Sequence, residues 1–176
     1  STRGALRWQH GHPWIFRSDV AAPPDAPAGD VVVLDERQRA LGVALWSPAS
    51  EISLRMMDRD TSARLDLAWW EERIARAITR RRPLDELANA YRLVHGEGDG
   101  LPSLVCDRYD RWLVVQLNSA GLEAFRPILV DVLRRVTGTA GILARNDAPL
   151  RKREGLEREV VTLDGEVPDE IEVIEH

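Results

Sequence analysis

Apolar positions in the first sixty residues mostly follow the two-residue period that is typical of β-strands. Two short apolar runs, Asp30–Asp35 and Ala40–Trp46, flank the polar Glu36–Arg39, which is a hairpin signal. Glu51–Met57 alternates as well, so every second side chain shares one face. Arg3–Val20 is interpreted as a loop that runs into a short strand, because a proline interrupts it. Several strands without an intervening helix predict a small barrel or sandwich.

The apolar period changes to that of a helix after residue 66. Apolar residues recur on one helical face between Leu67 and Arg82, with Asp66 as the predicted N-cap and Pro83 ending the helix. A second amphipathic helix is predicted over Ala120–Val136. Its Pro127 either kinks the helix or marks its true start.

A second hairpin and several further elements are predicted in the rest of the chain. Two apolar runs, Ser103–Asp107 and Trp112–Leu117, are joined by a polar turn of hairpin length. The other expected elements are strands at Gly141–Arg145, Val160–Leu163 and Glu170–Ile174, and a short basic turn or helix within Asn146–Gly155. The last strand has no successor to pair with, and an unpaired edge is a liability. We therefore expect this chain to be a piece of something longer.

The loop His95–Pro102 is the first candidate for function. It contains three glycines, which take positive φ angles or allow another backbone to approach closely. The polar side chains of His95, Glu97 and Asp99 alternate with these glycines and form the candidate functional loop. A metal site is one interpretation, but no further His or Cys lies at ligand spacing. We favour hydrogen bonds from loop amides to Glu97 and Asp99.

Composition and charge restrict the class of protein. The chain has 176 residues, 44% of them hydrophobic, and no apolar run approaches the roughly 18 residues that a membrane helix needs. We therefore expect no membrane partner, and the one cysteine suits a reducing, cytoplasmic setting. Residues 156–176 carry eight acidic and one basic side chains, whereas residues 1–155 carry 23 basic and 21 acidic ones. The acidity therefore belongs to the C-terminal part and does not exclude nucleic acid as a partner.

Several longer motifs follow one another along the chain: GHPWIF at 11–16, LGVALWSPASEISLRMM at 41–57, YRLVHGEGDGLPSLVCDRYDRWLVVQL at 91–117, RND at 145–147 and RKREGL at 151–156. The first two resemble a PUA domain, which is a small RNA-binding β-barrel. The whole set is similar to the bacterial large-subunit ribosomal RNA cytosine-5 methyltransferases that carry an N-terminal PUA domain. Two features depart from the family pattern: Ser103 replaces a usual glycine, and the first PUA strand, expected before Arg3, is either absent or lies outside this sequence.

The fold class expected from these patterns and this resemblance is α+β. Residues 1–62 are expected to form a PUA-like RNA-binding β-barrel, and residues 63–165 a central α/β domain whose mixed sheet carries two helices. The boundary lies near residues 58–66, where the apolar period changes. Residues 166–176 are expected to form a strand that leads to a missing C-terminal methyltransferase domain. A Rossmann-type methyltransferase domain is therefore expected to be absent from this chain.

Catalysis by this chain alone is not expected. The resemblance implies S-adenosylmethionine as the cofactor of the full-length protein, but no G-x-G-x-x-G follows a strand here, so we expect no cofactor in this chain. Methylation of cytosine at carbon 5 normally requires a thiolate nucleophile. Cys106 lies within an apolar run and is interpreted as a small buried hydrophobe. We therefore predict no catalytic residue, no metal ligand and no methyl transfer by the chain alone.

RNA contacts are expected from exposed arginines and one lysine. The candidates are Arg17, Arg55, Arg145, Arg151, Lys152 and Arg153, each of which is otherwise a solvated surface charge. As a group they suggest a phosphate track that gives affinity rather than base choice. Trp14, Trp46 and Trp70 fall on apolar faces and are interpreted as core, while Trp8 is the better candidate for base stacking.

Two functions from different classes remain open. The first is the substrate-positioning part of a methyltransferase that acts on large-subunit ribosomal RNA. The second is a stand-alone RNA-binding module without enzymatic activity. A small hydrolase that uses Glu97 and Asp99 lacks an identifiable nucleophile and base. The sequence leaves a homodimer open.

Overall fold

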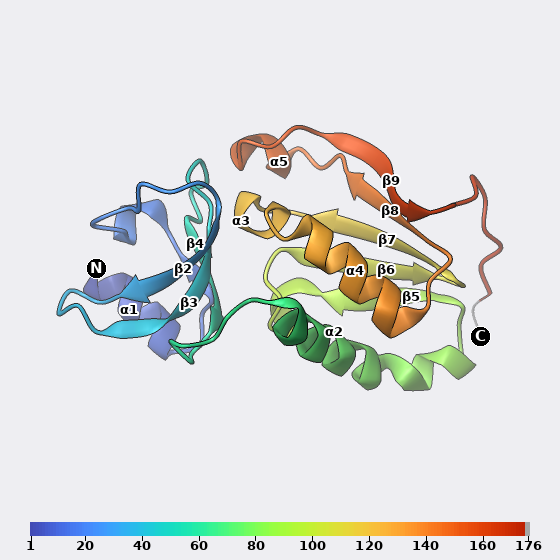
Figure 1. Cartoon of the computed structure of the whole chain (residues 1–176), viewed down its shortest axis with the longest axis horizontal. Coiled ribbons are helices and arrows are strands. Elements are labelled where there is room, and N and C mark those ends of the chain that lie inside the picture. The colour runs from blue at the N-terminus through green and yellow to red at the C-terminus, as the bar shows by residue number, and fades with distance from the viewer. Residues whose placement is uncertain (175–176) are drawn as a thin grey trace.

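The structure is a computed structural model that describes residues 1–174 and places two β-sheets side by side along the long axis (Figure 1). The N-terminal part contains, in chain order, α1 (Thr2–Gln9), β1 (Trp14–Ile15), η1 (Arg17–Asp19), β2 (Gly29–Leu34), β3 (Ala40–Trp46) and β4 (Leu54–Asp58). The later elements are α2 (Leu67–Arg81), η2 (Arg82–Glu86), β5 (Ala90–His95), η3 (Gly96–Asp99), β6 (Leu104–Tyr109), β7 (Trp112–Leu117), α3 (Ala120–Glu123), α4 (Arg126–Thr137), β8 (Gly141–Asn146), α5 (Leu150–Arg153) and β9 (Glu159–Gly165).

The N-terminal sheet is antiparallel, with the strand order β1-β4-β3-β2. The expected β-barrel is therefore wrong for the described residues, because β1 and β2 lie at opposite edges and do not pair. Strand β1 spans only Trp14–Ile15, which is too short to close a barrel. The hairpin of β2 and β3 is confirmed.

Helix α1 was not expected, because its region was interpreted as a loop. The side chain of Ser1 accepts a hydrogen bond from the backbone N–H of Gly4 and so caps the helix. The buried Trp8 on this helix donates its indole N–H to the carbonyl of Leu41, at 2.9 Å. This contact fixes the helix against β3, so tertiary packing stabilises eight residues that form only a marginal helix alone.

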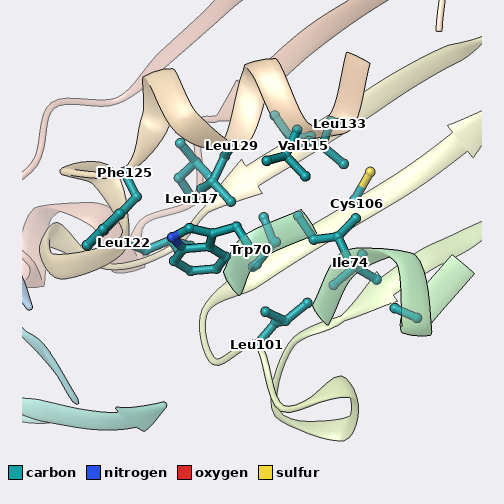
Figure 2. Packing of buried hydrophobic residues seen from close by; sticks show 14 of the residues in the cluster. Trp70, Ile74, Leu101, Cys106, Val115, Leu117, Leu122, Phe125, Leu129 and Leu133 are labelled. Atoms are coloured by element: carbon teal, nitrogen blue, oxygen red, sulfur yellow. The ribbon is translucent and has the colours of Figure 1, made fainter. Parts of the chain in front are cut away.

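The second sheet has the strand order β5-β6-β7-β8-β9, in which only β7 and β8 run parallel. Helices α2 and α4 pack against each other and cover one face of this sheet (Figure 1). Figure 2 shows Trp70 of α2 among apolar side chains from α3, α4 and the strands. Its ring lies 5.4 Å from that of Phe125, and both belong to the main apolar cluster.

Most of the elements predicted for this part are confirmed. Helix α2 begins after Asp66, whose side chain accepts a hydrogen bond from the N–H of Trp69. The hairpin of β6 and β7 forms as expected. Pro127 marks the true start of α4, which separates it from the short α3. The strand expected at Glu170–Ile174 is wrong, because this segment has no strand pairing.

Ser103, which stands where the similar family usually has glycine, has a φ of 71°. This left-handed conformation favours glycine, because a Cβ crowds the neighbouring carbonyl. The departure from the family pattern therefore falls at a position where a side chain strains the backbone.

The two central strands of the N-terminal sheet, β3 and β4, are mostly buried on both faces. One face packs on Trp8, and the other contributes Val43, Leu45 and Met57 to the main apolar cluster. Helix α3 packs against β2 and β3 at this second face. At Gly121 of α3, an added Cβ would lie only 2.8 Å from the Leu45 Cβ atom and from the Trp46 carbonyl oxygen. The two sheets therefore form one continuous core.

Replacing Gly121 with alanine is expected to lower the free energy of unfolding by roughly 1–3 kcal/mol, because the methyl group overpacks the contact between α3 and β3. Urea denaturation measures the change. The matched control is Gly29→Ala, where an added Cβ meets no atom within 4 Å. Equal unfolding midpoints for the two variants would contradict the expected close contact.

Candidate functional site

A buried carboxylate joins the two sheets. Glu154 follows α5, is 2% exposed, and its Oε1 atom lies 2.7 Å from a guanidinium nitrogen of Arg55 on β4. The hydroxyl of Ser50 donates to the same oxygen, and the backbone N–H of Ala120 donates to Oε2 at 3.2 Å. Both oxygens are thus satisfied, which is the condition for a buried ion pair to be tolerated.

Arg55 is correspondingly saturated. Its guanidinium also donates to the carbonyl of Ile52 at 3.0 Å and to the Ser47 hydroxyl at 3.4 Å. The expectation that Arg55 is an exposed RNA contact is wrong, because the residue is 3% exposed. The alternating pattern of its strand suggested a solvent face, but that face is covered by the second sheet and its helices.

Arg151 shows the same departure from expectation. It is 2% exposed and donates to the carboxylate of Glu123 at 2.9 Å and to the carbonyl of Glu157 at 2.9 Å. A third hydrogen bond goes to the carbonyl of Leu117. The predicted surface position of Arg151 is therefore wrong, and its role is to hold α5 against the sheet.

The other candidate cations, Arg17, Arg145, Lys152 and Arg153, remain exposed. Arg17 donates to the carbonyl oxygens of Pro48 and Ser50, the latter at 3.3 Å. Since Ser50 also bonds Glu154, Arg17 lies close to the end of α5, which carries the exposed Lys152 and Arg153. Arg17, Lys152 and Arg153 are called the junction cations below.

The fourth exposed candidate, Arg145, belongs to a different element from the junction cations. It lies on β8, its side chain is 64% exposed, and its nearest acidic partner is Asp147 at 3.8 Å. An exposed pair at this distance leaves the charge largely available to solvent or a ligand.

The Gly-rich loop is held from α2. The carboxylate of Asp99 lies 2.6 Å from Arg80 and 2.9 Å from Arg81, and its side chain is only 2% exposed. The backbone N–H of His95 donates to it at 2.7 Å, which confirms the expected bond to a loop amide. Burial raises the pKa of Asp99, but the hydrogen bonds from His95, Arg81 and Arg80 outweigh burial, so the pKa lies below its ordinary value.

The other two residues of the functional loop remain exposed. Glu97 accepts a hydrogen bond at 2.8 Å from the indole N–H of Trp14, which lies on β1 of the other sheet. The expected bond from a loop amide to the Glu97 carboxylate is replaced by this contact. His95 has its Nδ1 atom 3.3 Å from the guanidinium of Arg92. No group of three or more potential metal ligands lies together in residues 1–174.

The interpretation as core residues is confirmed for Trp46, Trp70 and Cys106 but not for Trp14. Trp46 and Trp70 are buried, whereas Trp14 is half-buried. Trp8 is wrong as a stacking candidate, because its ring is buried beneath Arg59 at 4.2 Å. Cys106 is fully buried, and burial raises the pKa of its thiol. A protonated thiol within the core is a poor nucleophile.

Comparison with known proteins finds a similarity for the N-terminal part and relatives for most of the chain. Residues 1–59 match the PUA-like domain family. The chain as a whole is 36% identical over 172 residues to Ribosomal RNA large subunit methyltransferase I of Cronobacter sakazakii, covering 93% of this chain and 42% of that protein. The protein of the same name from Escherichia coli is 36% identical over 168 residues, with the same coverage. The chain therefore spans less than half the length of the curated relatives that it matches.

Two solved structures have the same fold. A Streptococcus mutans protein assigned as a SAM-dependent methyltransferase superposes with a TM-score of 0.80 at 16% identity, over 96% of this chain and 43% of its own. A protein assigned as a methyltransferase and complexed with SAH gives a TM-score of 0.78 at 15% identity, over 96% and 42%. In the described residues, no helix is both long enough and apolar enough to cross a membrane.

These superpositions correct the expected fold class. We expected a Rossmann-type methyltransferase domain to be absent, but 96% of the chain, including its five-stranded mixed sheet, takes the fold of part of a methyltransferase. The expectation relied on the missing G-x-G-x-x-G motif. Such a motif serves a phosphate or cofactor, whereas the fold itself depends on strand pairing and apolar packing.

Replacing Glu154 with glutamine is expected to lower the free energy of unfolding by roughly 3–5 kcal/mol, because the charge of Arg55 stays buried without its counter-ion. Chemical denaturation at neutral pH measures the loss. The exposed Glu157→Gln variant removes the same charge and is expected to change stability by less than about 0.5 kcal/mol. If Glu154→Gln unfolds at the same denaturant concentration as this control, the ion pair does not join the sheets.

Replacing Asp99 with asparagine is expected to cost roughly 1–3 kcal/mol at pH 7, because Arg80 and Arg81 lose a charged acceptor. The pKa of Asp99 is lower in the folded protein, so its contribution is present above the ordinary value of 3.8 and is lost as the pH falls through the folded pKa. The difference in the free energy of unfolding between wild type and variant should therefore become smaller below about pH 4. Unfolding curves at pH 7 and pH 3 test this, with the exposed Asp25→Asn as the control. If the stability difference were the same at both pH values, the ionised carboxylate of Asp99 would not be its cause.

Proposed function

We propose that this chain binds large-subunit ribosomal RNA and positions it for methyl transfer from S-adenosylmethionine. The observation that carries the proposal is the chain of bonds from Arg17 through Ser50 to Glu154, the residue that directly follows the exposed Lys152 and Arg153. The PUA-like match of residues 1–59 and the names of the relatives support the same substrate. We propose the cytoplasm, where ribosomes are assembled, as the place of action.

Binding in this proposal depends on phosphate contacts. Guanidinium and ammonium groups pair with phosphate oxygens and release condensed counter-ions, which makes affinity depend on salt. Such contacts set the position of the RNA without reading its bases. The buried ion pair of Arg55 and Glu154 joins the part of the chain that carries Arg17 to the helix α5 that carries Lys152 and Arg153. The exposed Arg145 extends the proposed track along β8.

The proposed division of labour follows the sequence. Residues 1–62 supply the PUA-like RNA-binding part and residues 63–165 the central part, and the chain alone binds RNA without methylating it. The absence of methylation by the chain alone is supported by Cys106, which is the one cysteine and is fully buried.

A cavity of about 470 Å³ lies between α1 and β2, and residues such as Val31, Val33 and Leu54 line it. This lining lacks the Gly-rich strand-to-helix turn that suits S-adenosylmethionine. We therefore assign no residues of this chain to the binding of that cofactor.

The double variant Lys152→Glu/Arg153→Glu is expected to weaken binding to a large-subunit ribosomal RNA fragment. The slope of log affinity against log salt concentration should become shallower by about one per lost phosphate contact. Filter retention or fluorescence anisotropy over a series of salt concentrations measures both quantities. Arg151 is left unchanged, because it is buried and its loss would disturb the fold.

The matched control is Arg134→Glu/Arg135→Glu on α4, which reverses two charges that are paired with Asp131. It is expected to bind RNA nearly as tightly as the wild type. Equal affinity and salt slope for the wild type and the Lys152→Glu/Arg153→Glu variant would remove the junction cations from the proposal.

A further inference from the structure

The structure brings together two motifs that are far apart in the sequence. Trp14 belongs to GHPWIF at 11–16, and Glu97 belongs to the Gly-rich loop at 95–102. The indole N–H of Trp14 donates to Oε1 of Glu97 at 2.8 Å, across the line where the two sheets meet. Trp14, Leu45 and Arg55 are cross-strand partners, so they share the face of the N-terminal sheet that looks toward the second sheet.

The position of Glu97 does not depend on this hydrogen bond alone. Two residues later, Asp99 is tied to Arg80 and Arg81 of α2, and this fixes the short η3 helix that carries Glu97. Glu97 itself is exposed. Its second carboxylate oxygen, Oε2, has no hydrogen-bond partner among the described residues. A fixed, exposed acceptor therefore lies beside the edge of an indole ring.

His12 adds a donor to the same place. Its ring lies 5.6 Å from that of Trp14 in an edge-to-face arrangement, and its Nδ1 atom accepts the backbone N–H of Trp14 at 3.1 Å. Since Nδ1 is an acceptor, the proton of the neutral imidazole is on Nε2. His12 is exposed, so this N–H is free to donate to a ligand.

The Gly-rich loop that carries Glu97 is open to solvent at Gly100. Gly100 has a φ of 69°, and a Cβ added there would meet no atom within 4 Å, so open space lies beside the loop. Unpaired bases in RNA-binding proteins stack on aromatic rings, and their edges form hydrogen bonds with polar side chains. His12, Trp14 and Glu97 offer both kinds of group.

We propose that His12, Trp14 and Glu97 form a binding site for one unpaired nucleobase that carries an exocyclic amino group. This inference rests on the proposed RNA-binding function and adds base selection to it. The carboxylate of Glu97 accepts hydrogen bonds but cannot donate them. Adenine, cytosine and guanine offer amino N–H groups, whereas the one donor of the uracil edge lies between two carbonyl oxygens that repel a carboxylate. The site therefore selects against uracil.

The test compares oligonucleotides of adenylate, cytidylate and uridylate of equal length, with affinity measured by fluorescence anisotropy at one salt concentration. The wild-type chain is expected to bind the adenylate and cytidylate oligonucleotides roughly fivefold to tenfold more tightly than the uridylate one. In Glu97→Gln, the side-chain carbonyl can still accept the Trp14 indole N–H, and the new amide N–H₂ can donate to uracil. The preference should fall to about one in this variant.

The control separates this site from the junction cations. Lys152→Glu/Arg153→Glu is expected to weaken binding of all three oligonucleotides by the same factor and to leave the base preference unchanged. If wild type and Glu97→Gln show the same base preference while binding still depends on salt, the nucleobase site is wrong and Glu97 only tethers Trp14. If the wild-type chain binds none of the RNAs at any salt concentration, the proposed function fails as well.

Discussion

The buried ion pair between Arg55 and Glu154 determines how the two halves of this protein are related. It places a cation of β4 against a carboxylate that follows α5, with Ser50 and the Ala120 amide satisfying the remaining acceptor capacity. Removing one partner would leave the other charged and dry, which costs far more than a surface pair contributes. The ion pair therefore holds the sheets in one orientation, and every surface that spans both sheets depends on it.

Two such surfaces are important for the proposed function. One carries the junction cations, which supply affinity for a phosphate backbone. The other joins the Trp14 indole to the Glu97 carboxylate, which supplies a directed acceptor for a base edge. Each combines residues from the N-terminal part and from the second part of the chain, so neither part alone would reproduce it. This arrangement separates positioning of the RNA from selection of a base.

The predicted exposure of the candidate cations is confirmed where it follows from local structure and wrong where it depends on packing. Lys152 and Arg153 lie on a short surface helix and are exposed as expected. Arg55 and Arg151 are equally basic and were expected on the surface, yet both are buried and paired. An alternating strand has the same pattern whether its polar face meets water or a buried carboxylate, so the sequence could not distinguish the two cases.

The sequence by itself determined the local elements: the hairpins of β2 with β3 and β6 with β7, the Asp66 cap of α2 and the start of α4 at Pro127. Each depends on periodicity, turn chemistry or capping within a few residues. Only the tertiary structure decided that the N-terminal sheet stays open, that α1 forms, and that Trp14 meets Glu97. These features depend on contacts between distant segments, whose free energy is set by packing geometry and not by any local pattern.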